Sequence, residues 1–195
     1  MSKLKMTDFE IVREGFQMGP INLTIDDHQK LLVYGLNGVG KTTLLLGILG
    51  TLKTRGSLMI DEAEISSFPI EKRGVAYQPA NPAMIPHLKV KEILKLADPY
   101  HDNQLVKELK LAALLDVKGD KLSAGQARLI QIAAVLLSKA KVVLLDEPFS
   151  FLSEEYRNSV FDLIMNDRKV VIATAQERDE RFDAFLHLTR DPASH

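Results

Sequence analysis

The chain has 195 residues, enough for one domain with a substantial hydrophobic core. Apolar residues make up 46% and charged residues 26% of the chain, and the formal net charge of −1 does not favour nucleic acid as a main partner. The absence of cysteine excludes disulfide bonds and thiolate metal sites. The N-terminal residues lack the apolar core of a secretory signal, and no apolar stretch is long enough to span a membrane. We therefore expect a cytoplasmic protein that reaches a membrane only through a partner.

Hydrophobic periodicity predicts strands that alternate with helices along the chain. The predicted strands cover residues 21–25, 30–34, 57–65 (an arm of a hairpin), 74–78, 142–146 and 170–174. The predicted helices cover residues 41–52, 89–97, 103–115, 122–140 and 154–167, and the proline-rich segment 79–86 is an irregular loop. The continuous apolar run VVLLD at 142–146 is typical of a strand that is buried on both faces. This order predicts an α/β fold with a mainly parallel core sheet.

A glycine-rich loop lies between the predicted strand 30–34 and the helix that follows it. Its sequence, GLNGVGKT, fits the phosphate-binding pattern G-x-x-x-x-G-K-[ST] at residues 35–42. Backbone N–H groups of such a loop surround an anion at a helix N-terminus, Lys41 reaches the β- and γ-phosphates, and the Thr42 hydroxyl holds Mg²⁺. The alternative is a chance glycine loop, which the strand and helix on either side disfavour. The expected nucleotide-binding residues are Gly35, Asn37, Gly38, Gly40, Lys41, Thr42 and Thr43.

Two adjacent carboxylates end the strand VVLLD and are followed by a proline. A phosphate-binding loop of this kind needs an acid for Mg²⁺ at the end of a neighbouring strand, and Asp146 supplies it. Glu147 lies one residue further on, where it can face an attacking water. The alternative is an ordinary helix start, with Asp146 as the cap, Glu147 in the first turn and Pro148 closing the strand.

The segment LSAGQ at 122–126 opens the helix that leads into VVLLD, with Ser123 near the N-cap. Together the motifs GLNGVGKTT, YQP, LSAGQ and VVLLDEP, in this order, resemble those of the ABC-type ATPase family over residues 21 to about 176. The resemblance implies a P-loop NTPase fold with a mainly parallel core sheet, a small antiparallel β subdomain and a short helical subdomain. It implies one domain over 1–195, divided at 1–78, 79–121 and 122–195.

The resemblance also implies a role for each matching polar residue. Gln78 matches the glutamine that contacts Mg²⁺ and the attacking water, and Asp146 matches the Mg²⁺ aspartate. Glu147 matches the general base. The catalytic residues implied are Glu147, Gln78 and Lys41, the metal-binding residues are Thr42, Gln78 and Asp146, and the cofactors are ATP and Mg²⁺.

The LSAGQ motif matches positions that contact the γ-phosphate of an ATP held by another subunit. The residues concerned are Ser123, Gly125 and Gln126. The resemblance therefore implies a dimer of ATPase subunits, either two copies of this chain or this chain with another ATPase. Phe16 is the best candidate for the aromatic residue that stacks on adenine, although a core phenylalanine is an equal alternative.

Three positions depart from the family pattern. Ser153 stands where the family has an aspartate after the acidic pair Asp146 and Glu147. Ala175 stands where the family has a histidine that reaches the γ-phosphate, and Ala124 replaces the usual glycine of the LSAGQ motif. Gln176 follows Ala175 and reaches a phosphate only if the register slips by one residue. We expect ATP binding to survive these changes and hydrolysis to be slow in isolation, unless a different ATPase subunit supplies the missing groups.

The family implies an integral membrane transporter subunit as the partner and a peripheral location on the inner face of the cell membrane. Apolar residues of the loop 79–88, namely Met84, Ile85 and Leu88, are candidates for contacts with that subunit, or else they cap the helical subdomain. The short helical region looks most like the ATPases of haem exporters in cytochrome c maturation. A soluble ABC-type ATPase is the main alternative, and a small-molecule kinase is a weaker one.

Overall fold

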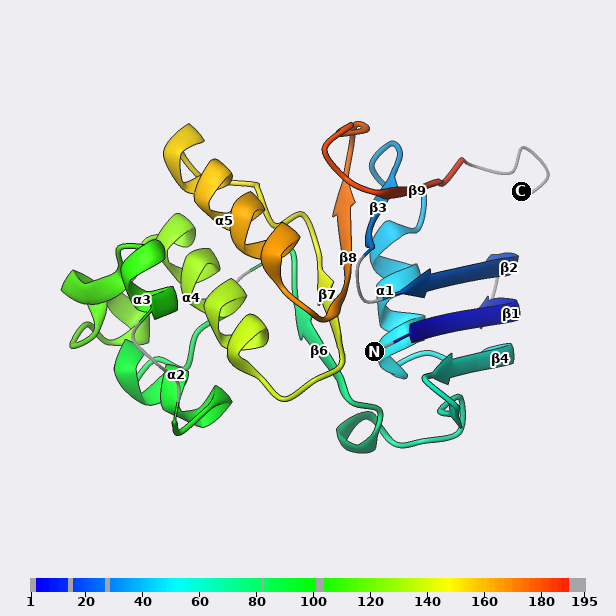
Figure 1. Cartoon of the computed structure of the whole chain (residues 1–195), viewed down its shortest axis with the longest axis horizontal. Helices are drawn as coiled ribbons and strands as arrows, with labels where there is room; N and C mark the ends of the chain where they lie inside the picture. Colours follow the sequence, from blue (N-terminus) through cyan, green and yellow to red (C-terminus); the bar gives the residue numbers. More distant parts are fainter. Residues whose placement is uncertain (1–2, 14–15, 27–28, 82, 101–103, 190–195) are drawn as a thin grey trace. The chain divides into compact units, whose positions relative to one another are not determined.

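The computed structural model describes residues 3–13, 16–26, 29–81, 83–100 and 104–189, and these form two compact units (Figure 1). The first unit comprises Met1–Tyr77, Ala140–Asp146 and Arg168–His195, and the second comprises Gln78–Lys139 and Glu147–Asp167. In the described part of the chain no helix has the length and apolar character that a membrane crossing requires.

The first unit contains a five-stranded sheet in the order β6-β7-β8-β3-β9. Its strands are β3 (Lys30–Tyr34), β6 (Val75–Gln78), β7 (Val142–Leu145), β8 (Val170–Ala175) and β9 (Ala184–His187). The pairs β7/β8 and β8/β3 are parallel, as the apolar runs predicted, and β9 adds a further parallel pair with β3. Parallel pairing brings the carboxyl ends of β3, β7 and β8 to one edge of the sheet, so the residues that follow these strands become neighbours.

A second sheet of the first unit is antiparallel, with the order β2-β1-β4-β5. Its strands are β1 (Lys3–Arg13), β2 (Phe16–Asp26), β4 (Thr54–Ile60) and β5 (Ala63–Glu64). A bulge between Met6 and Phe9 places Asp8 in the left-handed region at φ 47° and shifts the buried face of β1 by one residue. Asn22 of β2 holds the bulge through reciprocal hydrogen bonds with the backbone and the carboxylate of Asp8.

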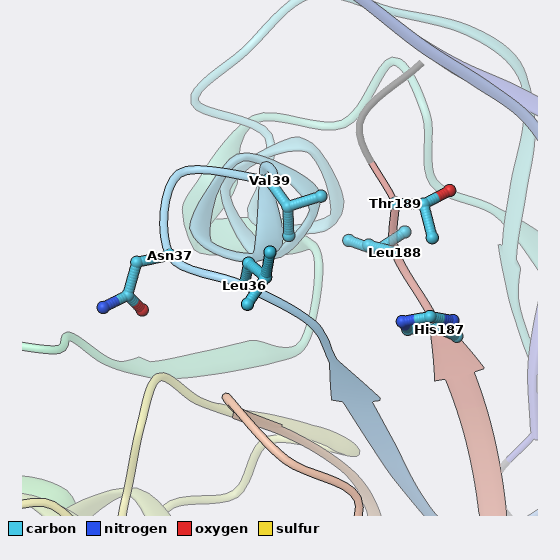
Figure 2. Close-up of a pocket in the computed structure, with 6 residues that line it drawn as sticks. All are labelled: Leu36, Asn37, Val39, His187, Leu188 and Thr189. Atoms are coloured by element: carbon cyan, nitrogen blue, oxygen red, sulfur yellow. The ribbon is translucent and has the colours of Figure 1, made fainter. Parts of the chain in front are cut away.

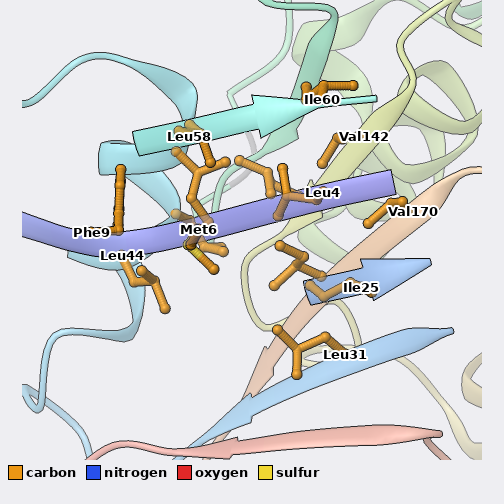
Figure 3. Packing of buried hydrophobic residues seen from close by; sticks show 14 of the residues in the cluster. Leu4, Met6, Phe9, Ile25, Leu31, Leu44, Leu58, Ile60, Val142 and Val170 are labelled. Atoms are coloured by element: carbon orange, nitrogen blue, oxygen red, sulfur yellow. The ribbon is translucent and has the colours of Figure 1, made fainter. Parts of the chain in front are cut away.

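Helix α1 (Lys41–Leu49) and both sheets of the first unit share one hydrophobic core (Figure 3). Gly47 allows α1 to approach β1 closely, because a Cβ at that position would lie 2.6 Å from the Ile11 side chain. Leu44 of α1, Leu4 of β1 and Val170 of β8 are fully buried in the cluster. The sheet edge that carries the polar residues therefore rests on a continuous apolar interior.

The second unit is helical. Its helices are α2 (Val90–Ala97), α3 (Gln104–Glu108), α4 (Ala124–Leu137) and α5 (Glu154–Asn166), and short 3₁₀ turns cover Leu111–Leu114 and Gly119–Lys121. A further 3₁₀ turn, Ile70–Lys72, belongs to the first unit. Ser123 caps α4 as predicted: the Gln126 N–H donates to its hydroxyl, and its own N–H donates to the Gln126 side chain.

Several predicted elements differ from those observed. The helix expected at 103–115 ends at Glu108, because Lys110 adopts a left-handed conformation at φ 52° and a 3₁₀ turn follows. Helix α1 ends at Leu49 rather than 52, because Gly50 in the left-handed region and the Thr51 N–H close a C-cap on the Leu46 carbonyl. Strands β1 and β9 were not predicted from the sequence, and β2 extends well beyond the predicted 21–25.

The hairpin of β4 and β5 allows a pH test of stability. Burial alone would raise the pKa of Glu64, but the hydrogen bonds that its carboxylate accepts from Ser57, Ser66 and Leu58 outweigh burial and lower the pKa to about 2. Because the folded state binds the proton less readily than the unfolded chain does, the ionised carboxylate stabilises the fold above the ordinary value of 4.5, and this stabilisation is lost as the pH falls toward 2.

We expect Glu64→Gln to lower the urea midpoint of unfolding at neutral pH and to match the wild type at about pH 2. The exposed neighbour Glu62, for which the described structure gives no hydrogen bond, provides the control Glu62→Gln. A difference between Glu64→Gln and the wild type that stays constant across this pH range would contradict the assignment.

Candidate active site

The glycine-rich loop joins β3 to α1 in the first unit, as the sequence predicted. Gly40 is the N-cap of α1 at φ 107°, and Gly38 has φ 77°, so both adopt a conformation that side chains disfavour. The buried Lys41 ammonium folds back over the loop and donates to the carbonyl oxygens of Gly35 (2.8 Å) and Leu36 (3.1 Å). A cation and a helix N-terminus are thereby held at one loop, which is the arrangement that binds phosphate groups.

Two side chains of β2 pack against this loop. A Cβ at Gly40 would lie 2.4 Å from Cε of Met18 and 3.2 Å from Cζ of Phe16. The backbone angle of Gly40 therefore favours glycine, and a side chain there would also displace the end of Met18 and press on the Phe16 ring. The ring of Phe16 is only half-buried and lies beside the phosphate-binding loop, so it is not enclosed in the main core.

The carboxylate of Asp146 is the polar centre of the first unit. It follows β7 and is 1% exposed. Three hydroxyl groups donate to it: Thr42 in the first turn of α1 (2.7 Å, to Oδ2), Thr174 near the end of β8 (2.7 Å, to Oδ1) and Tyr77 near the end of β6 (3.3 Å, to Oδ2). The predicted metal-binding residues Thr42 and Asp146 are thus in direct contact. A carboxylate beside a hydroxyl is a hard oxygen donor set, which fits Mg²⁺.

The sequence did not indicate Tyr77 and Thr174 as site residues. Burial and the negative charge of Asp146 raise the pKa of Tyr77 far above its ordinary value, so its hydroxyl is protonated and donates at neutral pH. Both residues precede predicted site positions at strand ends, Tyr77 before Gln78 and Thr174 before Ala175. Their position at the common edge of a parallel sheet was the available signal.

A pocket of about 340 Å³ lies on one side of the glycine-rich loop (Figure 2). Leu36 and Val39 are on the side of the loop that faces Leu188, whereas Asn37 is on the other side. The ring of His187, which also lines the pocket, stacks on Tyr34 with centroids 4.6 Å apart. Of the predicted nucleotide-binding residues only Asn37 lines this pocket, so it is distinct from the phosphate cradle formed with Lys41.

Gln78 is the last residue of β6 and also the first residue of the second unit. The side chain is fully buried, and its amide N–H donates to the Pro79 carbonyl oxygen. Within the described part of the chain, its amide oxygen Oε1 is buried without a hydrogen-bond partner. Because a buried acceptor without a partner is costly, this oxygen is suited to a ligand such as a metal ion or water.

Glu147 begins the other segment of the second unit, and it does not start a helix, which removes the alternative considered from the sequence. Its backbone lies in the left-handed region at φ 48°. Its carbonyl oxygen accepts the Ser150 N–H (3.1 Å), and its carboxylate accepts the Ser150 hydroxyl (3.2 Å). This tight turn sets the direction of the half-buried carboxylate.

The signature residues lie at the N-terminus of α4 and share a pocket with the segment before α5. This pocket, of about 440 Å³, is lined in part by Ser123, Gly125, Gln126, Phe151 and Ser153. Gly125 is required because a Cβ there would come within 2.8 Å of the Phe151 carbonyl oxygen. The Ser123 hydroxyl accepts the cap bond from Gln126, which leaves its own O–H able to donate to a ligand.

The three departures from the family pattern have different surroundings. Ala124 is exposed in the first turn of α4, so its methyl group is accommodated without a clash. Ser153 is the N-cap of α5, but its side chain makes no cap hydrogen bond. Ala175 is half-buried at the end of β8, and Gln176 is exposed. The first unit therefore brings together Phe16, the glycine-rich loop and Asp146, and the second contains Gln78, Glu147 and the signature residues.

Known proteins are similar to this chain in both sequence and fold. The ABC transporter family matches residues 18–150. The branched-chain amino acid transport ATP-binding protein LivF of Archaeoglobus fulgidus is 33% identical over 165 residues, which cover 76% of this chain and 70% of that protein. The maltose/maltodextrin import ATP-binding protein MalK of Yersinia pestis is 37% identical over 182 residues, or 88% of this chain. The chain spans only 47% of the length of MalK. Neither relative is named as a haem exporter, so they do not support that resemblance.

Solved structures agree with this assignment. An ABC transporter ATP-binding protein from Pyrococcus furiosus aligns with a TM-score of 0.80 at 26% identity, over 95% of this chain and 97% of that one. An ATP-binding subunit of an ABC transporter aligns with a TM-score of 0.85 at 22% identity, over 95% of this chain and 85% of the other, which shows a common fold. The chain therefore belongs to the ABC transporter family and carries its ATP-binding, ATP-hydrolysing domain.

Proposed function

We propose that the chain is the ATPase subunit of a transporter and acts at the inner face of the cell membrane on an integral membrane subunit. The observation that carries the proposal is the hydrogen bond between Thr42 and Asp146 beside Lys41. It joins the phosphate-binding loop to the acidic strand end, the two parts that Mg²⁺-dependent phosphoryl transfer requires. Family membership supports the same function.

ATP binding is assigned to the first unit. The backbone N–H groups of the loop 35–43 and the Lys41 ammonium would hold the phosphates, and Phe16 would stack on adenine. The contact of Phe16 with Gly40 supports this role because the ring borders the phosphate cradle. An aromatic ring beside the loop provides a flat apolar face of the kind on which a nucleotide base stacks.

Thr42, Asp146 and Gln78 would hold Mg²⁺. The ion, when bound, bridges phosphate oxygens and neutralises the charge that develops during transfer. Thr174 and Tyr77 fix the orientation of the Asp146 carboxylate through their hydroxyl groups. The buried amide oxygen of Gln78 supports its place in this set.

Glu147 is assigned as the general base, which accepts a proton from the water that attacks the γ-phosphate. The turn closed by Ser150 supports this role because it orients the carboxylate. Hydrolysis in isolation is slow in this proposal, because the Ala175 methyl group cannot donate to the γ-phosphate. Ser153 also lacks the carboxylate that the family uses between two sites.

The proposal includes a dimer of ATPase subunits. Ser123, Gly125 and Gln126 lie at a helix N-terminus, which favours an anion, and in the first unit the phosphates already have their own loop. We therefore infer that these residues contact an ATP bound by a second subunit, which is another copy of this chain or a different ATPase. In the second case that subunit supplies the groups missing at positions 153 and 175.

The membrane subunit would contact the segment that follows Gln78. Ile85 is 43% exposed there, and Leu88 and Pro86 accept backbone hydrogen bonds from Gly119 and Asp120, which hold the loop in place. An exposed apolar side chain on an anchored loop is suited to a protein contact. The short helical region supports a proposed resemblance to haem-exporter ATPases, whereas MalK, by its name, serves import.

The first test concerns the base. Glu147→Gln should lower ATP turnover about 10²- to 10⁴-fold, because it removes the proton acceptor. ATP binding, measured with a fluorescent analogue, should remain near the wild-type level, whereas Lys41→Ala should abolish it. If the isolated protein turns over ATP rapidly and Glu147→Gln has no effect, both the role of Glu147 and the slow-ATPase proposal are wrong.

The second test concerns the partner. Because the chain contains no cysteine, a single introduced cysteine can carry a probe at one chosen position. A photocrosslinker attached to Ile85→Cys should capture a multi-span membrane protein in native membranes, because Ile85 lies on the proposed contact loop. The matched control is Phe68→Cys, whose position in the first unit is similarly exposed at 41%. Equal capture from both positions, or a protein found only in the soluble fraction, would favour an ABC-type ATPase that is not linked to transport.

A further inference from the structure

Arg128 lies in the second turn of α4 and is fully buried in the second unit. Its neighbours on the helix, Ala127 and Leu129, are apolar core residues. A guanidinium group remains charged in proteins, and burying it is costly unless acceptors surround it. The contacts of Arg128 therefore indicate why a cation is kept at this position.

The guanidinium contacts two loops of the second unit, the one after Gln78 and the one that begins at Glu147. Nη1 donates to the carbonyl oxygen of Glu147 at 2.9 Å, and Nη2 donates to the carbonyl oxygen of Ala80. The ring of Phe151 lies 5.5 Å from the guanidinium carbon, within the range of a cation–π contact. One side chain thus connects the loop after Gln78 with the turn that begins at Glu147.

The Glu147 carbonyl is held from two sides. It accepts the Ser150 N–H as well as the Arg128 guanidinium, while the residue itself adopts the left-handed conformation at φ 48°. A non-glycine residue in this region persists only where its surroundings hold it. Phe151, at the far end of the same turn, is also left-handed, at φ 65°, and its side chain is 68% exposed. The cation beneath the turn is therefore well placed to hold both unusual residues.

We propose that Arg128 is a positioning residue for Glu147: it clamps the Glu147 main chain to the loop after Gln78 and thereby fixes the direction of the carboxylate. This inference rests on the proposed role of Glu147 as the base. The contact is made through the backbone of Glu147, so Arg128 acts on the orientation of the carboxylate and contacts no nucleotide.

Gln131, one turn further along α4, provides a matched control. Its amide N–H donates to the carbonyl oxygen of Ala83 at 2.8 Å, so it also holds the loop after Gln78. Among the described residues, Gln131 makes no hydrogen bond with Glu147. Arg128 and Gln131 therefore both hold the loop after Gln78, and of the two only Arg128 also holds the main chain of Glu147.

The experiment compares Arg128→Gln, Arg128→Lys and Gln131→Ala in the full chain. Hydrogen exchange should speed up in Arg128→Gln at the amides of Ala80, Asn81 and Ala83, where the guanidinium no longer holds the loop. It should also speed up at 147–153, because the amide of Ser150 bonds to the carbonyl that is released. In Gln131→Ala exchange should speed up only at 79–83. Arg128→Lys keeps the charge but cannot donate in a fork to two carbonyl groups, so it should show an intermediate effect.

ATP turnover provides the second readout. Arg128→Gln should lower kcat about 10- to 100-fold, since small misplacement of a reacting group costs this much, with little change in KM or in nucleotide binding. Arg128→Lys should recover part of the loss, and Gln131→Ala should stay within about threefold of the wild type. If Arg128→Gln does not fold, the same comparisons are made with Arg128→Lys.

Two results would overturn the proposal: unchanged exchange at 147–153 in the Arg128 variants, or a loss of turnover that appears in KM and binding rather than in kcat. Failure of the proposed function has a different signature. If Glu147 is not the base, Glu147→Gln retains turnover, while Arg128→Gln still releases the 147–153 segment in hydrogen exchange.

Discussion

The carboxylate of Asp146 organises the first unit. It is buried at the end of β7 and accepts hydrogen bonds from the hydroxyl groups of Thr42, Tyr77 and Thr174, which come from three other elements of the fold. A buried carboxylate is tolerated only when donors or a cation surround it. The parallel sheet makes these contacts possible because it ends its strands at one edge, and the fully buried apolar core beneath holds that edge in place. The phosphate-binding loop depends on the same edge, since Thr42 belongs to the helix that the loop opens.

The residues of the proposed chemistry are divided between the two units at two peptide bonds. Tyr77 and Asp146 end segments of the first unit, and Gln78 and Glu147 begin segments of the second. Nucleotide binding and the Mg²⁺ carboxylate are therefore assigned to the first unit, whereas Gln78 and the proposed base Glu147 belong to the second. This division gives a physical reason to expect variants that lose turnover but keep ATP binding. Arg128 extends the same logic within the second unit, since it connects the two segments that start at the boundary.

Sequence patterns were informative where local chemistry determines structure. The glycine-rich loop, the cap at Ser123 and the apolar run before Asp146 each depend on neighbouring residues, and the structure contains all three. Sequence patterns did not predict the elements correctly where an irregularity of the backbone interrupts the hydrophobic periodicity of a strand or helix. The bulge at Asp8 breaks the alternation of β1, and the left-handed Lys110 ends what looked like one long helix. Such irregularities depend on distant partners, as with Asn22 at the bulge, so the local sequence gave no sign of them.

The sequence by itself determined the family, the alternation of strands and helices, and the residues of the phosphate-binding loop, because these follow from residue types at short spacing. Only the tertiary structure decided which side chains converge on them. Tyr77 and Thr174 are 69 and 28 residues from Asp146, and Arg128 is 48 residues from Ala80. No local pattern relates positions so far apart, because the order of strands in the sheet and the packing of α4 bring them together. The tertiary structure therefore identified the groups that orient the carboxylates of Asp146 and Glu147.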